Sequence, residues 1–163
     1  MKIASWRIPP NVAVETEEAF RRGQHEVFAI WTIARAEVDA AEGAPPPVRV
    51  KRCVIPQQAP GESAGGVWVH IPGEELQRIQ IDNHTRRERS VIQLHTHPGA
   101  DVRMSALDRE WEVVRHVGAL SIIVPFYGVG GLRLHDAANV YERELHDWRL
   151  WSRGEARERL VLE

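Results

Sequence analysis

The stretch Val-Ile-Gln-Leu-His-Thr-His-Pro at residues 91–98 decides which fold this chain is expected to form. An apolar run leads directly into His95 and His97, which are two positions apart. On a β-strand that spacing places both imidazoles on one face, roughly 6.6 Å apart along the strand. Pro98 favours an extended backbone at His97, so the second histidine is expected at the end of the strand. Two imidazoles at this separation can converge on one metal ion.

A carboxylate follows at the start of the next element. Asp108 lies in the segment Ser105-Ala106-Leu107-Asp108, which has the pattern of a helix N-terminus. Ser105 can cap that helix, and Asp108 then places a negative charge in its first turn. Two histidines and one aspartate also make a zinc site with a fourth position left for water. Both interpretations of Asp108, helix cap and zinc ligand, are open at this point.

The pattern His95-x-His97-Pro98 followed by Ser105-x-x-Asp108 resembles the JAMM signature of the JAB/MPN metallopeptidases. The resemblance covers these fourteen positions, and elsewhere the chain agrees with the family in the order of its elements. It implies an α/β (α+β) fold, a mixed β-sheet flanked by helices, with residues 1–163 forming one JAB/MPN-like domain. It also implies one Zn²⁺ per chain, held by His95, His97 and Asp108.

The resemblance further implies two catalytic residues. Glu26 opens an apolar strand directly after a helix, which is where the family has its general base. A carboxylate there can take a proton from the attacking water and deliver it to the leaving amine. Ser105, three residues before Asp108, is placed to donate a hydrogen bond to the oxyanion of a tetrahedral intermediate. Amide hydrolysis by these groups needs no cysteine.

The resemblance implies cleavage of the peptide or isopeptide bond after the C-terminal tail of a ubiquitin-like protein, a deubiquitinase-like activity. The compact length is similar to that of prokaryotic members, which are associated with bacterial ubiquitin-like conjugation systems and antiphage operons. The expected partners are a ubiquitin-like protein or its conjugates, and associated conjugation enzymes. The tail is expected to bind by β-augmentation along an exposed strand edge. Two alternatives stay open: a non-catalytic MPN scaffold, and an amidase or sulfur-carrier-protein processing enzyme.

The composition is that of a globular chain and excludes several other classes. Of the 163 residues, 43% are hydrophobic and 27% are charged, and the formal net charge of −2 does not indicate a nucleic-acid-binding surface. There is no apolar run that could span a membrane and no signal peptide, so a cytoplasmic location is expected. The single cysteine, Cys53, excludes an internal disulfide and is expected to be a small core residue.

Other metal and hydrolase motifs fail on residue type. A cupin needs a glutamate shortly after His97, where this chain has Pro-Gly-Ala-Asp. The His-x-His-x-Asp-His pattern of metallo-β-lactamases fails because Gly99 and Ala100 occupy its last two positions. The letters Gly-x-Ser-x-Gly occur at residues 61–65, but they fall inside the loop expected at 58–66 and not at the strand-to-helix turn that forms the elbow of an α/β-type serine hydrolase.

The remaining elements are predicted from apolar periodicity and turn residues. Strands are expected at residues 3–8, 27–34, 48–55, 67–71 and 119–126, and helices at 14–22, 73–86 and 105–117. Either Thr16 or Asn11 would cap the first helix, and Leu107, Trp111, Val114 and Val117 would face inward from the third. Loops are expected at 40–47 and 58–66, a turn at 128–131 and a short hairpin strand at 132–135. Trp148 and Trp151 indicate a C-terminal helix packed on the core.

Overall fold

A computed structural model describes residues 2–23, 25–39, 45–63 and 66–163 of the chain. Its strands are β1 (Ser5–Ile8), β2 (Phe28–Ala34), β3 (Pro47–Val54), β4 (Ala59–Ser63), β5 (Gly66–His70), β6 (Glu88–Thr96), β7 (Leu120–Val124), β8 (Asn139–Arg143), β9 (Trp148–Leu150) and β10 (Leu160–Leu162). Its helices are α1 (Pro10–Arg22), α2 (Arg35–Asp39), α3 (Gly73–Arg86), α4 (Ala106–Glu110) and α5 (Arg153–Arg159), with the 3-10 turn η1 (Phe126–Gly128).

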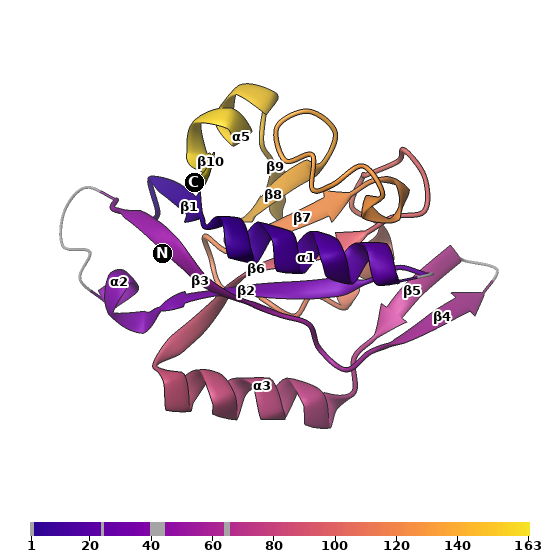
Figure 1. Ribbon diagram of the computed structural model, residues 1–163, viewed down its shortest axis with the longest axis horizontal. Helices are drawn as coiled ribbons and strands as arrows, with labels where there is room; N and C mark the ends of the chain where they lie inside the picture. The colour runs from indigo at the N-terminus through magenta and orange to yellow at the C-terminus, as the bar shows by residue number, and fades with distance from the viewer. Residues whose placement is uncertain (1, 24, 40–44, 64–65) are drawn as a thin grey trace.

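Eight of these strands form one mixed sheet in the order β10-β1-β3-β2-β6-β7-β8-β9. β1 is parallel to β10 and β3, and β6 is parallel to β7, while β2 is antiparallel to both β3 and β6. β4 and β5 form a separate antiparallel hairpin, which extends away from the sheet at one end of the molecule (Figure 1). The expected mixed sheet flanked by helices is confirmed.

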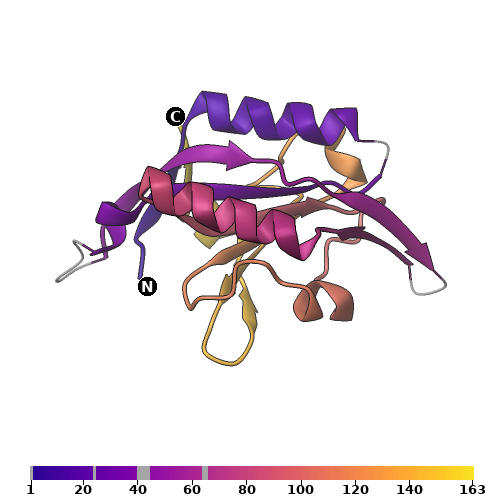
Figure 2. The ribbon, with the colours of Figure 1, turned by 90° about the horizontal axis from the view of Figure 1, so that it is seen from below.

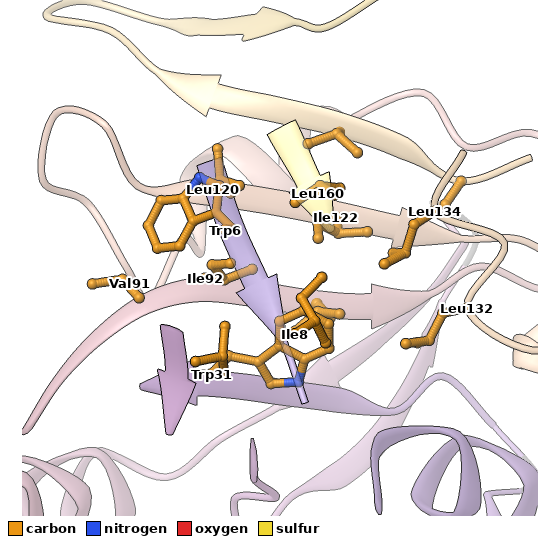
Figure 3. Packing of buried hydrophobic residues seen from close by; sticks show 14 of the residues in the cluster. Trp6, Ile8, Trp31, Val91, Ile92, Leu120, Ile122, Leu132, Leu134 and Leu160 are labelled. Atoms are coloured by element: carbon orange, nitrogen blue, oxygen red, sulfur yellow. The ribbon is translucent and has the colours of Figure 1, made fainter. Parts of the chain in front are cut away.

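Helices cover both faces of the sheet. Trp31 of β2 belongs to the core cluster that contains Phe20 of α1, whereas its neighbour Ile30 belongs to a second cluster that contains Ile79 of α3. Because successive side chains of a strand point to opposite faces, α1 and α3 lie on opposite sides of β2. Figure 2 shows α1 lying along its side of the sheet, and Figure 3 shows Trp6 and Trp31 in the larger cluster.

The central strands are apolar along almost their whole length because both of their faces are covered. Every residue of β7 is buried, as are the last six residues of β6 and the first six of β2. This arrangement fixes the end of β6, which contains His95 and is followed by His97, between two buried neighbouring strands.

Several predicted elements are confirmed. Helix α3 begins and ends at the predicted residues, and strands occupy most of the segments predicted at 3–8, 27–34, 48–55, 67–71 and 119–126. Helix α1 begins earlier than predicted, at Pro10, and its N-cap is Pro9, so neither Asn11 nor Thr16 caps it. Proline is favoured at the first helical position, which Pro10 occupies here, because its fixed φ suits the first turn and its missing N–H would have no partner there. Among the described residues, no helix combines the length and apolar character required to cross a bilayer.

The prediction of a helix over 105–117 is wrong beyond its first turn. Helix α4 ends at Glu110, and the chain then runs irregularly to Gly118. The side-chain oxygen of Gln93, on β6, accepts hydrogen bonds from the backbone N–H groups of Val113 and Val114, at 3.0 and 2.9 Å. These bonds withdraw both N–H groups from a helix. Of the four residues expected to face inward, Val114 is buried, Leu107 is partly buried, and Trp111 and Val117 are exposed.

Three further predictions need correction. The loop expected at 58–66 contains β4, which pairs with β5, and the strand expected at 132–135 is irregular. The predicted C-terminal helix is instead strand β9 at Trp148, with helix α5 starting only at Arg153. Trp148 and Trp151 are both buried, so their packing on the core was predicted but their backbone was not. Of the loop expected at 40–47, residues 40–44 lie outside the described residues, and Pro47 begins β3.

Cys53 lies partly buried against the core, as expected of a structural residue. The hydroxyl of Thr16 is 3.2 Å from its sulfur. Burial raises the pKa of the Cys53 thiol to about 11, which keeps the thiol protonated at neutral pH.

Candidate metal centre

The two histidines are held by the backbone pairing of β6. His95 lies opposite Phe28 of β2 on one side and Ile123 of β7 on the other. His97 follows the strand, and its N–H donates to the carbonyl of Val124 at 2.8 Å. Because both backbones are fixed in this way, the positions of the two imidazoles do not depend on a flexible loop.

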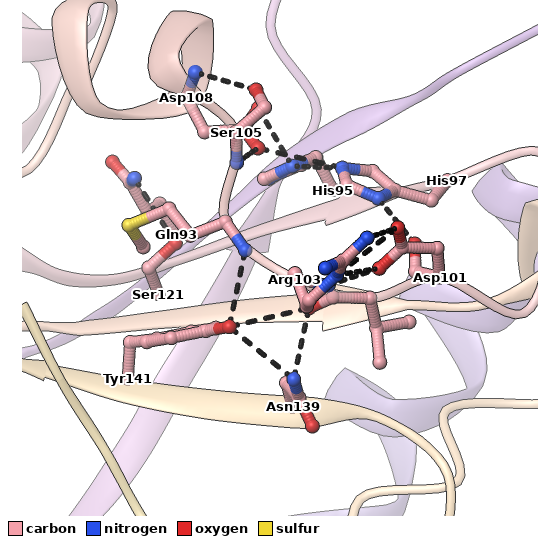
Figure 4. Close-up of polar contacts among 12 residues, drawn as sticks. Gln93, His95, His97, Asp101, Arg103, Ser105, Asp108, Ser121, Asn139 and Tyr141 are labelled. Atoms are coloured by element: carbon pink, nitrogen blue, oxygen red, sulfur yellow. Dashed lines mark hydrogen bonds and ion pairs between the residues drawn. The ribbon is translucent and has the colours of Figure 1, made fainter.

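Asp108 meets both histidines from the first turn of α4 (Figure 4). Its Oδ1 lies 3.1 Å from His95 Nε2, and its Oδ2 lies 3.5 Å from His97 Nε2. The same carboxylate closes a capping box: Ser105 N–H donates to Asp108 Oδ2 at 2.7 Å, and Asp108 N–H donates to Ser105 Oγ at 3.1 Å. The helix-cap interpretation is therefore confirmed, and the cap itself aims the carboxylate at the histidines.

The three side chains converge as ligands of one ion would. One ligand-type atom from each of His95, His97 and Asp108 lies within 4.8 Å of the other two. The two Nε2 atoms are 3.1 Å apart. His97 Nδ1 is 2.7 Å from the carbonyl oxygen of Asp101, which can only accept, so Nδ1 carries the proton. In the neutral ring the lone pair is then on Nε2 and faces the centre of the group.

Charge in this group favours a cation at its centre. Burial would raise the pKa of the Asp108 carboxyl, but hydrogen bonds from His95 and His97 hold it well below its usual range. Burial lowers the pKa of His97, but its hydrogen bonds to Asp108 and to the Asp101 carbonyl, together with the negative charges of Asp108 and Glu26, raise that pKa above its ordinary value. When the Nε2 atoms of the two imidazoles give up the protons of these hydrogen bonds, two nitrogen lone pairs and an ionised carboxylate, partly buried together, suit Zn²⁺ as a ligand set.

Glu26 is tied to the histidine strand by the residue that follows it. Val27 N–H donates to Thr96 Oγ1 at 3.0 Å, and Val27 O accepts from Thr96 N–H at 3.1 Å. Thr96 lies between the two histidines, so Glu26 is placed beside them. Burial raises the pKa of Glu26 to about 7, with His97 lowering it and Asp108 raising it. A carboxyl group with this pKa can both accept and release a proton near neutral pH.

The structure brings the five predicted site residues together. Glu26, His97, Ser105 and Asp108 line one hollow, and Glu26, His95 and Asp108 line a second. The backbone between His97 and Ser105 is anchored from below, where Tyr141 Oη accepts the Met104 N–H at 3.1 Å (Figure 4).

Apolar residues beside these groups also belong to the site, although their sequence pattern did not predict it. Phe28 stacks on the His95 ring, with the ring centroids 6.1 Å apart and the planes 6° from parallel. Trp68 lines both hollows, and Trp111 lines the second. The importance of Gln93 could have been predicted, because a polar residue in the middle of a buried strand must find polar partners.

Comparison with known proteins identifies a family. No known family profile matches this chain. The chain is 30% identical over 142 residues to the probable metalloprotease y4jG of Sinorhizobium fredii (strain NBRC 101917 / NGR234), an alignment that covers 80% of this chain and 82% of the relative. The chain belongs to this metalloprotease family. A metalloprotease implies a metal ion, and His95, His97 and Asp108 are the one group of metal-ligating side chains found in the described parts of the chain.

The fold of this metalloprotease is also similar to a solved structure. The solution structure of protein DSY2949 from Desulfitobacterium hafniense matches with a TM-score of 0.61, over 97% of this chain and 92% of that one. The two sequences are 10% identical, so this likeness concerns the fold alone.

Proposed function

We propose that the chain is a JAMM-type zinc metallopeptidase that hydrolyses the peptide or isopeptide bond after the C-terminal tail of a ubiquitin-like protein. The observation that carries the proposal is the convergence of His95, His97 and Asp108 beside Glu26. Family membership supports a metal-dependent peptidase, and two imidazoles with one carboxylate leave zinc an open position for catalysis. When bound, the ion supplies Lewis-acid polarisation of the carbonyl and lowers the pKa of a water.

Glu26 is the proposed general base. Its carboxylate accepts a proton from the attacking water as the new C–O bond forms. The resulting carboxylic acid then gives that proton to the amine as the C–N bond breaks. A pKa of about 7 suits both halves of this transfer, because the donor and the acceptor forms of Glu26 are then both accessible at neutral pH.

Ser105 is the proposed oxyanion donor. Its Oγ accepts the Asp108 N–H, and the hydroxyl hydrogen is left to donate elsewhere. Ser105 lines the same hollow as Glu26 and His97, so a carbonyl bound there has the hydroxyl beside its oxygen. A hydrogen bond that strengthens as negative charge develops lowers the barrier.

The β4–β5 hairpin is the proposed docking edge for the tail. Gly66 and Val67 of β5 line the hollow that also contains Ser105, and within the described parts of the chain each strand of this hairpin has one edge without a strand partner. An extended tail can pair with such an edge and lead its last carbonyl to the site. We place this activity in a bacterial ubiquitin-like conjugation or antiphage system in the cytoplasm, with the conjugates and associated conjugation enzymes as partners.

Zinc analysis combined with cleavage assays tests the proposal. Native protein should contain about one zinc per chain by elemental analysis and should cleave members of a panel of ubiquitin-like fusion proteins. Asp108→Asn should lose the zinc, while the exposed control Asp136→Asn should keep both zinc and activity. Glu26→Gln should keep the zinc and lose about 100-fold or more in rate.

The alternatives give different outcomes in the same experiment. If fusion proteins bind without being cleaved, the chain is a non-catalytic scaffold and not a peptidase. Cleavage of small amides but of no fusion protein would point to an amidase. Cleavage confined to sulfur-carrier fusions would point to a sulfur-carrier processing enzyme.

A further inference from the structure

Two hollows meet at the candidate metal centre, and they differ in character. Both are lined by Glu26, Trp68, Leu107 and Asp108. The first also contains Ser105 and the β5 backbone, where we place the substrate tail. The second extends past His95, and the mechanism proposed above does not use it.

The second hollow has apolar walls of large side chains. They are Phe28, Trp68, Val69, Leu107 and Trp111. Trp111 is 47% exposed, although it is a large aromatic residue, and it meets the His70 ring edge-on with the centroids 6.0 Å apart. A tryptophan half-exposed beside a reactive centre leaves apolar surface that a ligand can cover.

The position of Trp68 is specified by its neighbour in the hairpin. Gly61 lies opposite Trp68 in the β4–β5 register. A Cβ at position 61 would lie only 2.2 Å from the Trp68 indole nitrogen. The indole therefore crosses the strand over a residue without a side chain, and this crossing is what allows Trp68 to face both hollows.

The polar groups of the second hollow are already engaged or belong to the centre. The Gln93 side-chain oxygen accepts from Val113 N–H and Val114 N–H, and its nitrogen donates to Ser121 Oγ at 3.3 Å. Glu26, His95 and Asp108 face the proposed reaction. Among the residues that the structure describes, no lysine or arginine lines this hollow to pair with an acidic side chain. Its chemistry fits an apolar occupant.

We propose that the second hollow binds the first residue after the scissile bond, and that this residue is bulky and apolar, such as phenylalanine, leucine or tryptophan. The inference rests on the proposed function, which places the tail in the first hollow along β5. The residue on the other side of the scissile bond then lies across Asp108, against Trp68 and Trp111. The favoured substrates are accordingly linear fusions with an apolar residue after the tail.

The test varies one residue of a substrate. A ubiquitin-like fusion protein cleaved by the zinc-loaded enzyme is remade with phenylalanine, leucine, glycine or aspartate directly after the tail. We expect kcat/KM to be at least about tenfold higher for phenylalanine and leucine than for glycine or aspartate. Trp111→Ala should lower kcat/KM for the phenylalanine and leucine substrates much more than for the glycine substrate and so remove this preference, and Trp111→Phe should largely keep it. Leu150→Ala, which alters a similarly exposed residue on β9, should change nothing.

A binding measurement does not depend on turnover. Phenylalaninamide, which represents the leaving residue, is titrated into the protein while the indole N–H signals of the tryptophans are followed by NMR. We expect the signals of Trp68 and Trp111 to shift, with no shift on addition of glycinamide.

The outcomes separate the two proposals. Cleavage with equal rates for all four residues, or a loss in Trp111→Ala that is equal for all substrates, overturns the subsite alone. Absence of cleavage for every fusion overturns the proposed function and the place of the subsite in it, even if phenylalaninamide binds. If phenylalaninamide shifts neither the Trp68 nor the Trp111 indole N–H signal, the proposal that the second hollow binds an apolar residue is overturned.

Discussion

The side-chain amide of Gln58 hydrogen-bonds both backbone groups of Phe28. Phe28 N–H donates to Gln58 Oε1 at 2.6 Å, and Gln58 Nε2 donates to Phe28 O at 2.9 Å. Gln58 thus takes the place of a strand partner at the start of β2, two residues after Glu26. This pairing joins the residue before the β4–β5 hairpin to the start of the strand that follows the proposed base.

Removing this amide should loosen the hairpin from the site. In Gln58→Ala, two partly buried backbone groups of Phe28 lose their partner, which typically costs about 1–3 kcal/mol for each unsatisfied group. We expect a lower free energy of unfolding by urea denaturation and lower cleavage activity. The neighbouring Gln57→Ala is the matched control, because the Gln57 side chain is exposed and only its backbone N–H is bonded. Equal effects of the two variants would contradict the bridging role.

Glu26 should lower stability at the pH where it serves as a base. Burial raises its pKa from an ordinary 4.5 to about 7, so folding favours the protonated carboxyl. The stabilisation from this shift is complete below pH 4.5 and is lost as pH rises through 7. In chelated, metal-free protein at pH 8, Glu26→Gln should therefore melt at a higher temperature than native protein. The difference should shrink as pH falls towards 5.

The control for this measurement is a carboxylate in solvent. Glu74→Gln, at the exposed start of α3, makes the same change of charge without burial and should show no such pH-dependent gain. A Glu26→Gln variant that is less stable than native protein at pH 8 would show that the ionised carboxylate is satisfied in the fold. A stabilised variant without activity is the expected result for a group retained for chemistry.

Much of the site could be predicted because its geometry is local. His95 and His97 share a face through the period of a strand, and Ser105 and Asp108 form a capping box whose spacing is visible in the sequence. What the sequence could not supply is the orientation of the cap towards the strand. That orientation depends on the segment 98–104, which is held by Tyr141 from a distant strand.

The errors in the fold have the same origin in distant contacts. Trp111 to Val117 has a helical apolar pattern, but the Gln93 side chain takes two of its N–H groups. Pro60 and Gly61 are typical of a loop, yet they lie in β4, where Trp68 on the paired strand packs across the glycine. At the first of these places a side chain from another strand overrides the local propensity, and at the second the pairing with β5 does.

Gly61 should tolerate no side chain without moving Trp68. In Gly61→Ala the new methyl group would meet the indole at 2.2 Å, so the ring must leave its place between the two hollows. We expect the Trp68 indole N–H signal to move in NMR spectra and the preference for an apolar residue after the tail to weaken. Gly73→Ala is the control, because a Cβ there meets no atom within 4 Å. An unchanged Trp68 signal in Gly61→Ala would contradict the packing described here.

The contribution of Ser105 to stability, as a helix cap, should be separable from its contribution to catalysis. Ser105→Ala removes an N-cap, which typically costs about 1 kcal/mol, and it also removes the proposed oxyanion donor. Ser152→Ala is a matched control, because Ser152 caps α5 in the same way, accepting from Glu155 N–H at 3.1 Å, without lining either hollow. Both variants should lose similar stability in thermal denaturation and keep the zinc, but only Ser105→Ala should lose about 100-fold in kcat. Equal activities of the two variants would show that Ser105 serves only as a helix cap. Loss of zinc in Ser105→Ala would show that the cap is needed to hold Asp108 on the metal.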